Sequence, residues 1–136
     1  MKIYIASSWA NYHGVEMLTE LLRKENFEVN SWIENNRKNP FNSFEGTNAD
    51  ICFGFDTTSA NKCDIFIYYA PAGMDACVEL GIAFSSSNHP LILGLKNEKD
   101  NLGLMRKCVN NWFHSYKQII LCCCEHRHII HNLSQC

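Results

Sequence analysis

One carboxylate lies inside an otherwise apolar segment of the chain. From Ala76 to Phe84 every residue except Glu79 is apolar or glycine, and a helix that is apolar on nearly all sides is expected to be buried. An ionised carboxylate costs several kcal/mol to bury without a partner, so Glu79 must be solvated, paired or used in chemistry. Gly81, two residues later, would let a backbone or a ligand approach closely. These residue types leave open a functional acid, a buried ion pair and a contact with the helix dipole.

The residues around Glu79 predict a strand, a turn, a helix and a second strand. Residues 65–69 are aromatic and β-branched, and Pro71 and Gly73 interrupt that run before the periodicity changes. Residues 90–93 then return to an apolar strand pattern. In open α/β sheets ligands bind at the carboxyl ends of the strands, so the turn before Glu79 is expected at a ligand-binding edge.

Three aspartates accompany Glu79, and each has a structural explanation beside any functional one. Asp56 is followed by Thr-Thr-Ser, a pattern that fits a helix N-cap, and Asp75 fits the cap of the helix that carries Glu79. Asp64 opens the central strand, where a charged residue is costly unless it is hydrogen-bonded. We expect Asp64 to be structural, and leave Asp56 and Asp75 open between capping and chemistry.

Three segments carry a family resemblance. They are Lys2-Ile-Tyr-Ile-Ala-Ser-Ser-Trp9, Asp56 followed eight residues later by Asp64-Ile-Phe-Ile, and Ala70-Pro-Ala-Gly-Met-Asp-Ala-Cys-Val-Glu-Leu-Gly-Ile-Ala83. Together they resemble the nucleoside 2-deoxyribosyltransferase superfamily, which includes small deoxynucleotide N-hydrolases and is a distant relative of TIR-type NAD glycohydrolases. The resemblance covers roughly residues 1–112. Its most specific part is the Glu-Leu-Gly-x-Ala sequence in its strand–turn–helix setting.

The resemblance implies three catalytic residues. Glu79 matches the family's nucleophile, and Asp56, by its distance from Asp64, matches a general acid or base-binding carboxylate. Tyr4 matches a tyrosine that touches the nucleophile in some members. Breaking an N-glycosidic bond builds positive charge on the sugar, which a carboxylate can stabilise or bond to. Protonation of the departing base speeds its release.

Five further residues are expected to bind substrate. Ser7, Ser8 and Trp9 follow the first strand, where the hydroxyls could hold a phosphate and Trp9 could stack on a base. Gly73 and Asp75 stand just before Glu79, and Asp75 could orient the ribose 3′-hydroxyl. The Gly-rich, Arg-bearing loop of the monophosphate hydrolases has no counterpart in the sequence.

The preferred function is cleavage of the N-glycosidic bond of a (deoxy)nucleoside or nucleotide, with transfer of the sugar to another base or to water. One alternative is TIR-like cleavage of NAD, in which the same glutamate would serve. Another is a catalytically silent nucleotide-binding or assembly module, because a fold alone does not prove activity.

The remaining pattern predicts a flavodoxin-like or Rossmann-type three-layer sandwich with a mainly parallel sheet of about five strands. Strands are expected at residues 2–6, 27–33, 65–69, 90–93 and 118–123, and helices at 14–24, 49–63, 74–84 and 102–112. Residues 34–50 are polar and rich in Asn, with Phe41 and Phe44 among them, and are expected to form a mobile loop over the site. The two aromatic residues could equally pin this segment to the core. A second polar loop is expected at 96–101.

The chain of 136 residues predicts one domain, at residues 1–121, followed by a tail at 122–136. The tail reads Cys122-Cys-Cys-Glu-His-Arg-His128-Ile-Ile-His131, which contains residue types that bind zinc. Its spacing matches no common pair of ligand couples, and contiguous cysteines cannot all face one ion from a strand. We therefore expect a surface tail and no metal.

Charge and composition point to a small-molecule partner. The net charge is −2 with scattered Lys and Arg, so neither a nucleic acid polymer nor a membrane surface is expected as a partner. The start lacks a signal-peptide core, which favours the cytoplasm. Among the eight cysteines, Cys52, Cys63 and Cys77 fall on apolar segments and are expected to be reduced core residues. No cofactor is expected, and the resemblance suggests a homodimer or higher homo-oligomer.

Overall fold

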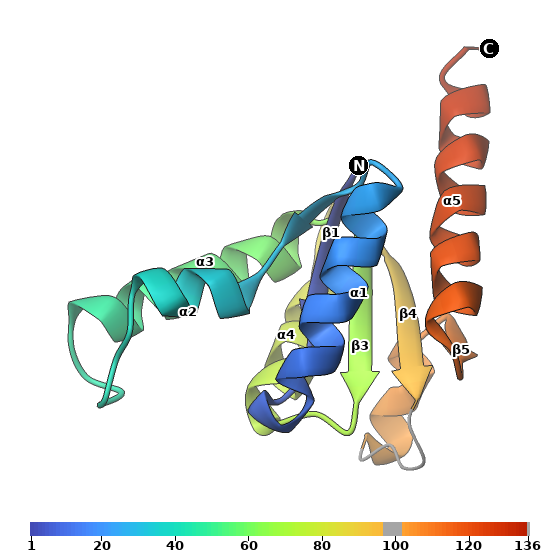
Figure 1. Ribbon diagram of the computed structural model, residues 1–136. Helices are drawn as coiled ribbons and strands as arrows, with labels where there is room; N and C mark the ends of the chain where they lie inside the picture. The colour runs from blue at the N-terminus through green and yellow to red at the C-terminus, as the bar shows by residue number, and fades with distance from the viewer. Residues whose placement is uncertain (97–101, 136) are drawn as a thin grey trace.

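A computed structural model describes residues 1–96 and 102–135, and its centre is a five-stranded parallel sheet (Figure 1). The strand order is β2-β1-β3-β4-β5, and each neighbouring pair is parallel. The strands are β1 (Lys2–Ala6), β2 (Glu28–Asn30), β3 (Ile65–Ala70), β4 (Leu91–Lys96) and β5 (Asn111–Phe113). The predicted parallel sheet of about five strands is confirmed.

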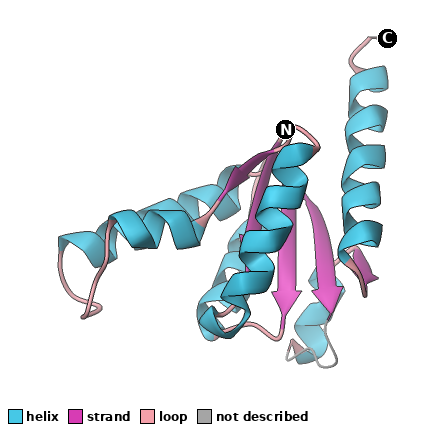
Figure 2. Ribbon diagram, viewed as in Figure 1, coloured by secondary structure: helices cyan, strands magenta, loops and turns pink. Residues whose placement is uncertain are grey.

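Helices cover both faces of this sheet. The α-helices are α1 (Tyr12–Lys24), α2 (Trp32–Lys38), α3 (Thr47–Lys62), α4 (Met74–Ser85) and α5 (Tyr116–Leu133), and two 3-10 helices are η1 (Trp9–Asn11) and η2 (Gly103–Cys108). Figure 1 shows α1 and α5 on one face and α4 on the other, with α3 packed against α4. Helix α2 packs along α3, and Figure 2 shows this pair extending beyond the edge of the sheet. The three-layer α/β sandwich is therefore confirmed.

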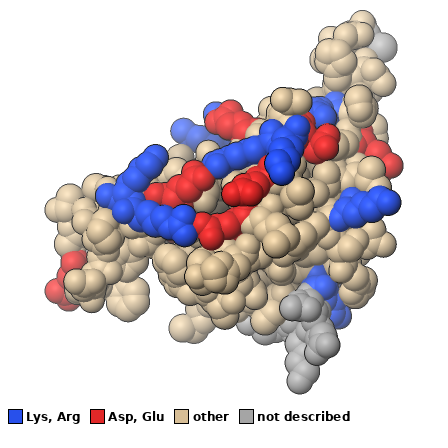
Figure 3. Space-filling model, in the orientation of Figure 1, with Lys and Arg blue, Asp and Glu red and all other residues tan. Residues whose placement is uncertain are grey.

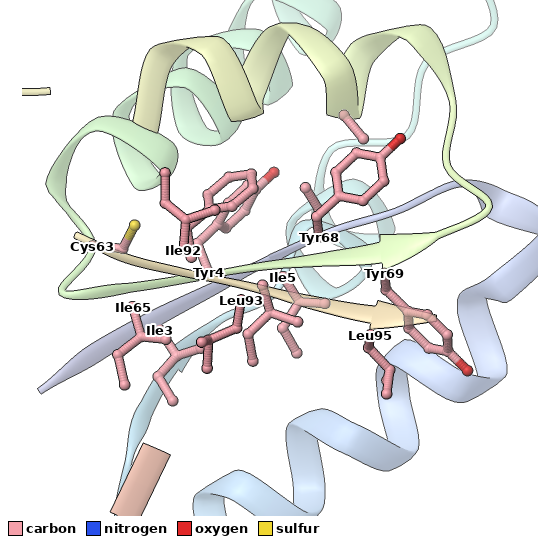
Figure 4. Packing of buried hydrophobic residues seen from close by; sticks show 14 of the residues in the cluster. Ile3, Tyr4, Ile5, Cys63, Ile65, Tyr68, Tyr69, Ile92, Leu93 and Leu95 are labelled. Atoms are coloured by element: carbon pink, nitrogen blue, oxygen red, sulfur yellow. The ribbon is translucent and has the colours of Figure 1, made fainter. Parts of the chain in front are cut away.

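The two faces of the sheet carry alternate side chains of each strand, as the pleat requires. In Figure 4, Ile3, Ile5 and Ile65 point to the side of α1, whereas Tyr4 and Tyr68 point to the side of α3 and α4. Every residue of β3 is buried, which is expected for a central parallel strand covered on both faces.

Asp64 has the structural role predicted for it. Its carboxylate accepts a hydrogen bond of 2.6 Å from the backbone N–H of Lys2, and its own N–H donates to the Lys2 carbonyl at 2.9 Å. These bonds join the starts of β1 and β3, and so fix the relative position of the loops that leave their opposite ends.

The prediction of a strand at 27–33 is only partly right, because Trp32 and Ile33 begin helix α2. The Ser31 hydroxyl accepts a hydrogen bond from the Glu34 N–H at 3.3 Å, which caps the helix. The prediction of one long loop at 34–50 is correspondingly wrong. Within this range, residues 34–38 belong to α2 and residues 47–50 belong to α3. Only residues 39–46 connect the two helices.

The C-terminal part of the chain also differs from the prediction. Residues 102–112 contain η2 and the start of β5 instead of one helix, and the predicted strand at 118–123 lies within α5. The Ser115 hydroxyl accepts from the Gln118 N–H at 3.3 Å and caps that helix. Ile119 and Cys123, four residues apart, are its buried positions, so a short apolar run that suits a strand is here one face of a helix.

Residue 122 is therefore inside α5, and the tail expected from 122 continues this helix to Leu133. Of the polar loop predicted at 96–101, residues 97–101 lie outside the described residues.

Gly94 of β4 supports the ring of Trp112 on β5, its register partner. A Cβ at position 94 would fall on Trp112 Cε3 and come within 2.7 Å of Cζ3. Gly94→Ala is therefore expected to displace Trp112 and to lower the free energy of unfolding by about 1–3 kcal/mol. Thermal unfolding measures this as a fall in Tm.

Gly54→Ala on α3 is the matched control for Gly94→Ala. A Cβ at position 54 meets no described atom within 4 Å, and alanine favours a helix by up to about 1 kcal/mol over glycine. Its Tm should be unchanged or higher. Equal Tm values for the two variants would contradict the close packing of Trp112 on Gly94.

Candidate active site

The loops that follow β1 and β3 are tied together at the carboxyl edge of the sheet. The Ser7 hydroxyl donates to the Tyr69 carbonyl at 2.9 Å. The Asn11 side-chain amide donates to Ser7 Oγ at 3.0 Å and to the Pro71 carbonyl at 2.6 Å. Asn11 was not among the predicted site residues, yet it fixes the position of both loops.

Helix α4 places Glu79 against the rest of the protein. The helix begins after Gly73, which is its N-cap residue, and Glu79 lies on the buried side with 9% of its surface exposed. The prediction that α4 is buried on nearly all sides is wrong, because Val78 and Phe84 are 61% and 60% exposed. Among the described residues no basic side chain forms an ion pair with Glu79, so a buried structural salt bridge does not explain it.

Asp56 approaches Glu79 from helix α3. It lies in the interior of that helix, which runs from Thr47 to Lys62, so it is not a helix N-cap. Its Oδ1 atom is buried and has no hydrogen-bond partner among the described residues. The capping explanation for Asp75 also fails, because Gly73 holds the N-cap position of α4 and Asp75 lies in the first turn of the helix.

A cavity of about 550 Å³ lies beside these carboxylates. Seven of the eight predicted site residues line it, and they are Ser7, Ser8, Trp9, Asp56, Gly73, Asp75 and Glu79. The eighth, Tyr4, is fully buried and reaches the two catalytic candidates from the sheet. The fold thus brings together residues from β1, α3 and α4 that the sequence separates widely.

The far wall of the cavity comes from the α2–α3 pair. Trp32, Asn36, Cys52, Phe53 and Thr57 line it and were not predicted as site residues. Phe41 and Phe44 of the connection also line it, as expected for a segment over the site. The Trp9 ring meets the edge of Trp32 at 4.8 Å between centroids. Ser31, which caps α2, is the local sequence signal for this helix, whereas the strand predicted at residues 27–33 leaves Trp32 outside the site.

Burial and mutual repulsion raise the pKa values of the two acids. The pKa of Glu79 rises from 4.5 to about 8, chiefly through burial and then through the charges of Asp56 and Asp75. The pKa of Asp56 rises from 3.8 to about 6, again chiefly through burial. At pH 7 the two carboxyls together therefore hold about one proton, which lies mainly on Glu79.

The Tyr4 hydroxyl opposes both shifts, because as a proton donor it lowers the pKa of Glu79 and of Asp56. Its own pKa is well above the ordinary value, first because it is buried. Tyr4 Oη is buried and forms no hydrogen bond with a described residue in the free protein. Tyr4 is therefore positioned to tighten onto a carboxylate that becomes ionised.

Tyr4→Phe is expected to raise the pKa of both carboxyls by removing this donor, and so to move the acidic limb of a pH–rate profile to higher pH. At pH 7 the rate should fall by roughly tenfold, the usual effect of losing one hydrogen bond to a charged group. Tyr12→Phe, which removes a hydroxyl outside the cavity lining, is the control. An unmoved acidic limb would show that Tyr4 does not act on these acids.

The Cys- and His-rich segment of α5 does not gather into a metal site. Within residues 1–96 and 102–135 no group of three or more His, Cys, Asp or Glu is arranged to hold an ion. Cys52 and Cys63 are buried free thiols, and Cys77 is a half-buried one, as predicted. In the same part of the chain no helix is both long and apolar enough to span a membrane.

Known proteins were compared with the chain. No family model and no curated protein sequence matches it. A structure of the 2-deoxyribosyltransferase from the psychrotolerant bacterium Bacillus psychrosaccharolyticus is 20% identical, with a TM-score of 0.70 over 88% of this chain and 90% of that one. A structure of the CMP N-glycosidase from Clostridium botulinum is also 20% identical, with a TM-score of 0.57 over 89% and 96%. The resemblance seen in the sequence is thus confirmed at the level of fold, which this chain shares with the 2-deoxyribosyltransferase and the N-glycosidase.

Proposed function

We propose that the protein cleaves the N-glycosidic bond of a nucleoside or nucleotide, with Glu79 as nucleophile, and passes the sugar to another base or to water. The observation that carries this proposal is the position of Glu79. It is buried, without an ion pair among the described residues, and lies next to Asp56 on the wall of a cavity of about 550 Å³. The fold shared with a deoxyribosyltransferase and an N-glycosidase supports it.

The reaction requires the acid pair in its singly protonated state. An ionised Glu79 bonds to the anomeric carbon as the C–N bond breaks, while a protonated Asp56 gives its proton to the departing base. Both requirements are met when the pair holds one proton and that proton is on Asp56, which is the minor arrangement in the free protein because Glu79 has the higher pKa. Base or water then attacks the glycosyl-enzyme and releases Glu79 as a carboxylate.

The cavity lining offers contacts for both the base and the sugar of the substrate. Trp9 and the aromatic residues of the α2–α3 pair provide surfaces on which a base can stack. Ser7, Ser8 and Asp75 supply polar groups for the sugar, and Gly73 leaves the backbone open to it. These residues are our proposed binding site.

Incubation with a panel of nucleosides, nucleoside monophosphates and NAD, scored for free base by chromatography, tests the function. Release of nicotinamide from NAD without release from other substrates would favour the TIR-like alternative. Binding without base release over hours, unchanged by Glu79→Ala, would favour a silent module. A 2-fluoro sugar analogue should trap an adduct on the peptide that contains Glu79, and an adduct elsewhere would refute that nucleophile.

We further propose that the protein acts as a homo-oligomer in the cytoplasm. The basis for an oligomer is that large apolar side chains are exposed on helix α4, with Met74 86%, Val78 61% and Phe84 60% exposed, and that exposed apolar surface can mark an interface. The free thiols among the described residues suit a reducing compartment. Light scattering coupled to size-exclusion chromatography measures the oligomer directly.

A further inference from the structure

The lining of the cavity is acidic and aromatic and lacks a counter-charge. Four carboxylates line it, Asp50, Asp56, Asp75 and Glu79, together with five aromatic rings, Trp9, Trp32, Phe41, Phe44 and Phe53. Among the described lining residues there is no Lys, Arg or His. The protein as a whole carries 12 basic and 14 acidic residues, so this segregation belongs to the cavity and not to the composition.

Basic side chains are present nearby but are engaged on the outer surface. Arg37 pairs with Glu16 at 2.6 Å, and Arg23 pairs with Glu34 at 2.6 Å. The face shown in Figure 3 accordingly has Lys and Arg intermingled with Asp and Glu. In the cavity, by contrast, no basic side chain among the described lining residues accompanies the carboxylates.

This lining opposes a phosphorylated ligand and favours a cationic one. A phosphate would meet like charges, which disfavour binding and are not offset by a described cation in the lining. A flat cation gains from both features, because the faces of aromatic rings attract positive charge and nearby carboxylates add to that attraction.

From this lining we propose that the preferred ligand is a nucleoside without phosphate whose base carries a fixed positive charge on its glycosidic ring, such as an N-ribosylpyridinium. The inference deepens the proposed function and rests on it for the cleavage step. The positive charge would lie among the aromatic rings and the outer carboxylates, Asp50 and Asp75. The sugar would lie toward Glu79.

The chemistry of such a substrate balances without an added proton. A Glu79 carboxylate oxygen bonds to the anomeric carbon, and the ring nitrogen keeps the electron pair of the broken C–N bond, so the base departs neutral. Water then attacks the anomeric carbon, its oxygen bonds to the sugar, Glu79 leaves as a carboxylate and one proton passes to Asp56 or to solvent. No oxidant, metal or general acid is required for the first step.

The burial of Glu79 agrees with this assignment. In the free protein burial and Asp56 hold its pKa at about 8, so the nucleophile is largely protonated at pH 7. A bound cation favours the ionised carboxylate. The substrate charge would thus help to create the nucleophile that attacks it, which a neutral nucleoside would not do.

Binding of 1-methylnicotinamide and of nicotinamide to the full chain, by calorimetry at low ionic strength, tests the preference for charge. The two compounds share one ring system, and only the first is a cation. We expect the Kd of the cation to be lower by at least about fivefold, and the preference to shrink at 0.5 M NaCl as exposed charges are screened.

Two single variants locate the effect. Asp50→Asn removes a lining charge that has no proposed catalytic role and should reduce the preference for the cation by roughly twofold. Glu45→Gln removes the same charge from an exposed position outside the lining and should leave the preference unchanged. Equal effects of both variants would mean that net charge, and not the cavity, selects the cation.

The preference against phosphate is measured with nicotinamide riboside and its 5′-monophosphate, using Glu79→Gln to prevent turnover. The riboside should bind at least about fivefold more tightly. Three results would overturn the inference. They are equal binding of the two compounds within each pair, tighter binding of the monophosphate than of the riboside, and no binding of 1-methylnicotinamide up to about 10 mM. If the inference fails but neutral nucleosides are cleaved, the proposed N-glycosidic cleavage still stands. If the cation binds but no substrate is cleaved, the proposed cleavage is refuted and the preference for a cation stands.

Discussion

Glu79→Gln is expected to lower the rate of base release by at least about 1,000-fold, because the amide cannot form a glycosyl-enzyme. The side chain keeps its size on the buried face of α4, so the loss would reflect chemistry and not packing. The measurement is single-turnover release of base from the best substrate of the panel, followed by chromatography. Glu45→Gln, an exposed acid outside the cavity lining, should retain the full rate.

The same variant should fold at least as well as the natural protein. The pKa of Glu79 is about 8 in the folded state and 4.5 ordinarily, so between these values the folded state binds more protons than the unfolded one. Stability is therefore lost as the pH rises from about 4.5 to 8, and a glutamine removes that loss. We expect Glu79→Gln to be more stable by about 1–3 kcal/mol at pH 8 and nearly equal at pH 4.

These two results together separate a catalytic acid from a structural one. A rate close to that of the natural protein would refute the nucleophile. A Tm that falls at pH 8 would instead show that the ionised carboxylate stabilises the fold through a partner.

The rate of base release from a neutral nucleoside is expected to show a bell-shaped dependence on pH, with limbs near pH 6 and pH 8. The limbs follow from the pKa values of about 6 and about 8 for Asp56 and Glu79. Below the lower limb both acids are protonated and the nucleophile is absent, and above the upper limb both are ionised and the base receives no proton. Each limb should fall roughly tenfold per pH unit.

Asp56→Asn provides the decisive comparison for this profile. The variant removes the general acid, so the alkaline limb should disappear. It also removes the repulsion that raises the pKa of Glu79, so the remaining limb, which reports ionisation of Glu79, should lie below pH 8. The kcat/KM values from pH 5 to 9 measure both effects. A bell that persists unchanged in Asp56→Asn would show that another group supplies the second limb.

Much of the fold follows from local pattern. Residues 2–6, 65–69 and 90–93 predict strands where β1, β3 and β4 are found, and the turn at Pro71 and Gly73 correctly precedes the helix of Glu79. The three strands are apolar runs that are buried in the sheet, and the helix of Glu79 is marked by the Pro and Gly residues that precede it. Their neighbours in the chain suffice to identify them.

Two short segments are predicted less well. Residues 27–33 and 118–123 both resemble strands, yet Trp32 begins α2 and Ile119 lies in α5. The apolar residues interspersed with polar ones at 27–33 and the apolar run at 119–123 each fit a strand or one side of a buried helix, and packing against neighbouring elements decides between them. The Ser31 and Ser115 caps are the local features that favour the helices.

From the amino-acid sequence alone it follows that an acid stands in an apolar helical segment after a Gly/Pro turn, and that a second acid lies eight residues before the central strand. The tertiary structure brings Tyr4, Asp56 and Glu79 together, because they come from β1, α3 and α4 and are joined by sheet pairing and helix packing. It also decided the aromatic and acidic character of the cavity, since half of its wall comes from α2 and α3. The pKa values follow from that burial and proximity, which no local pattern encodes.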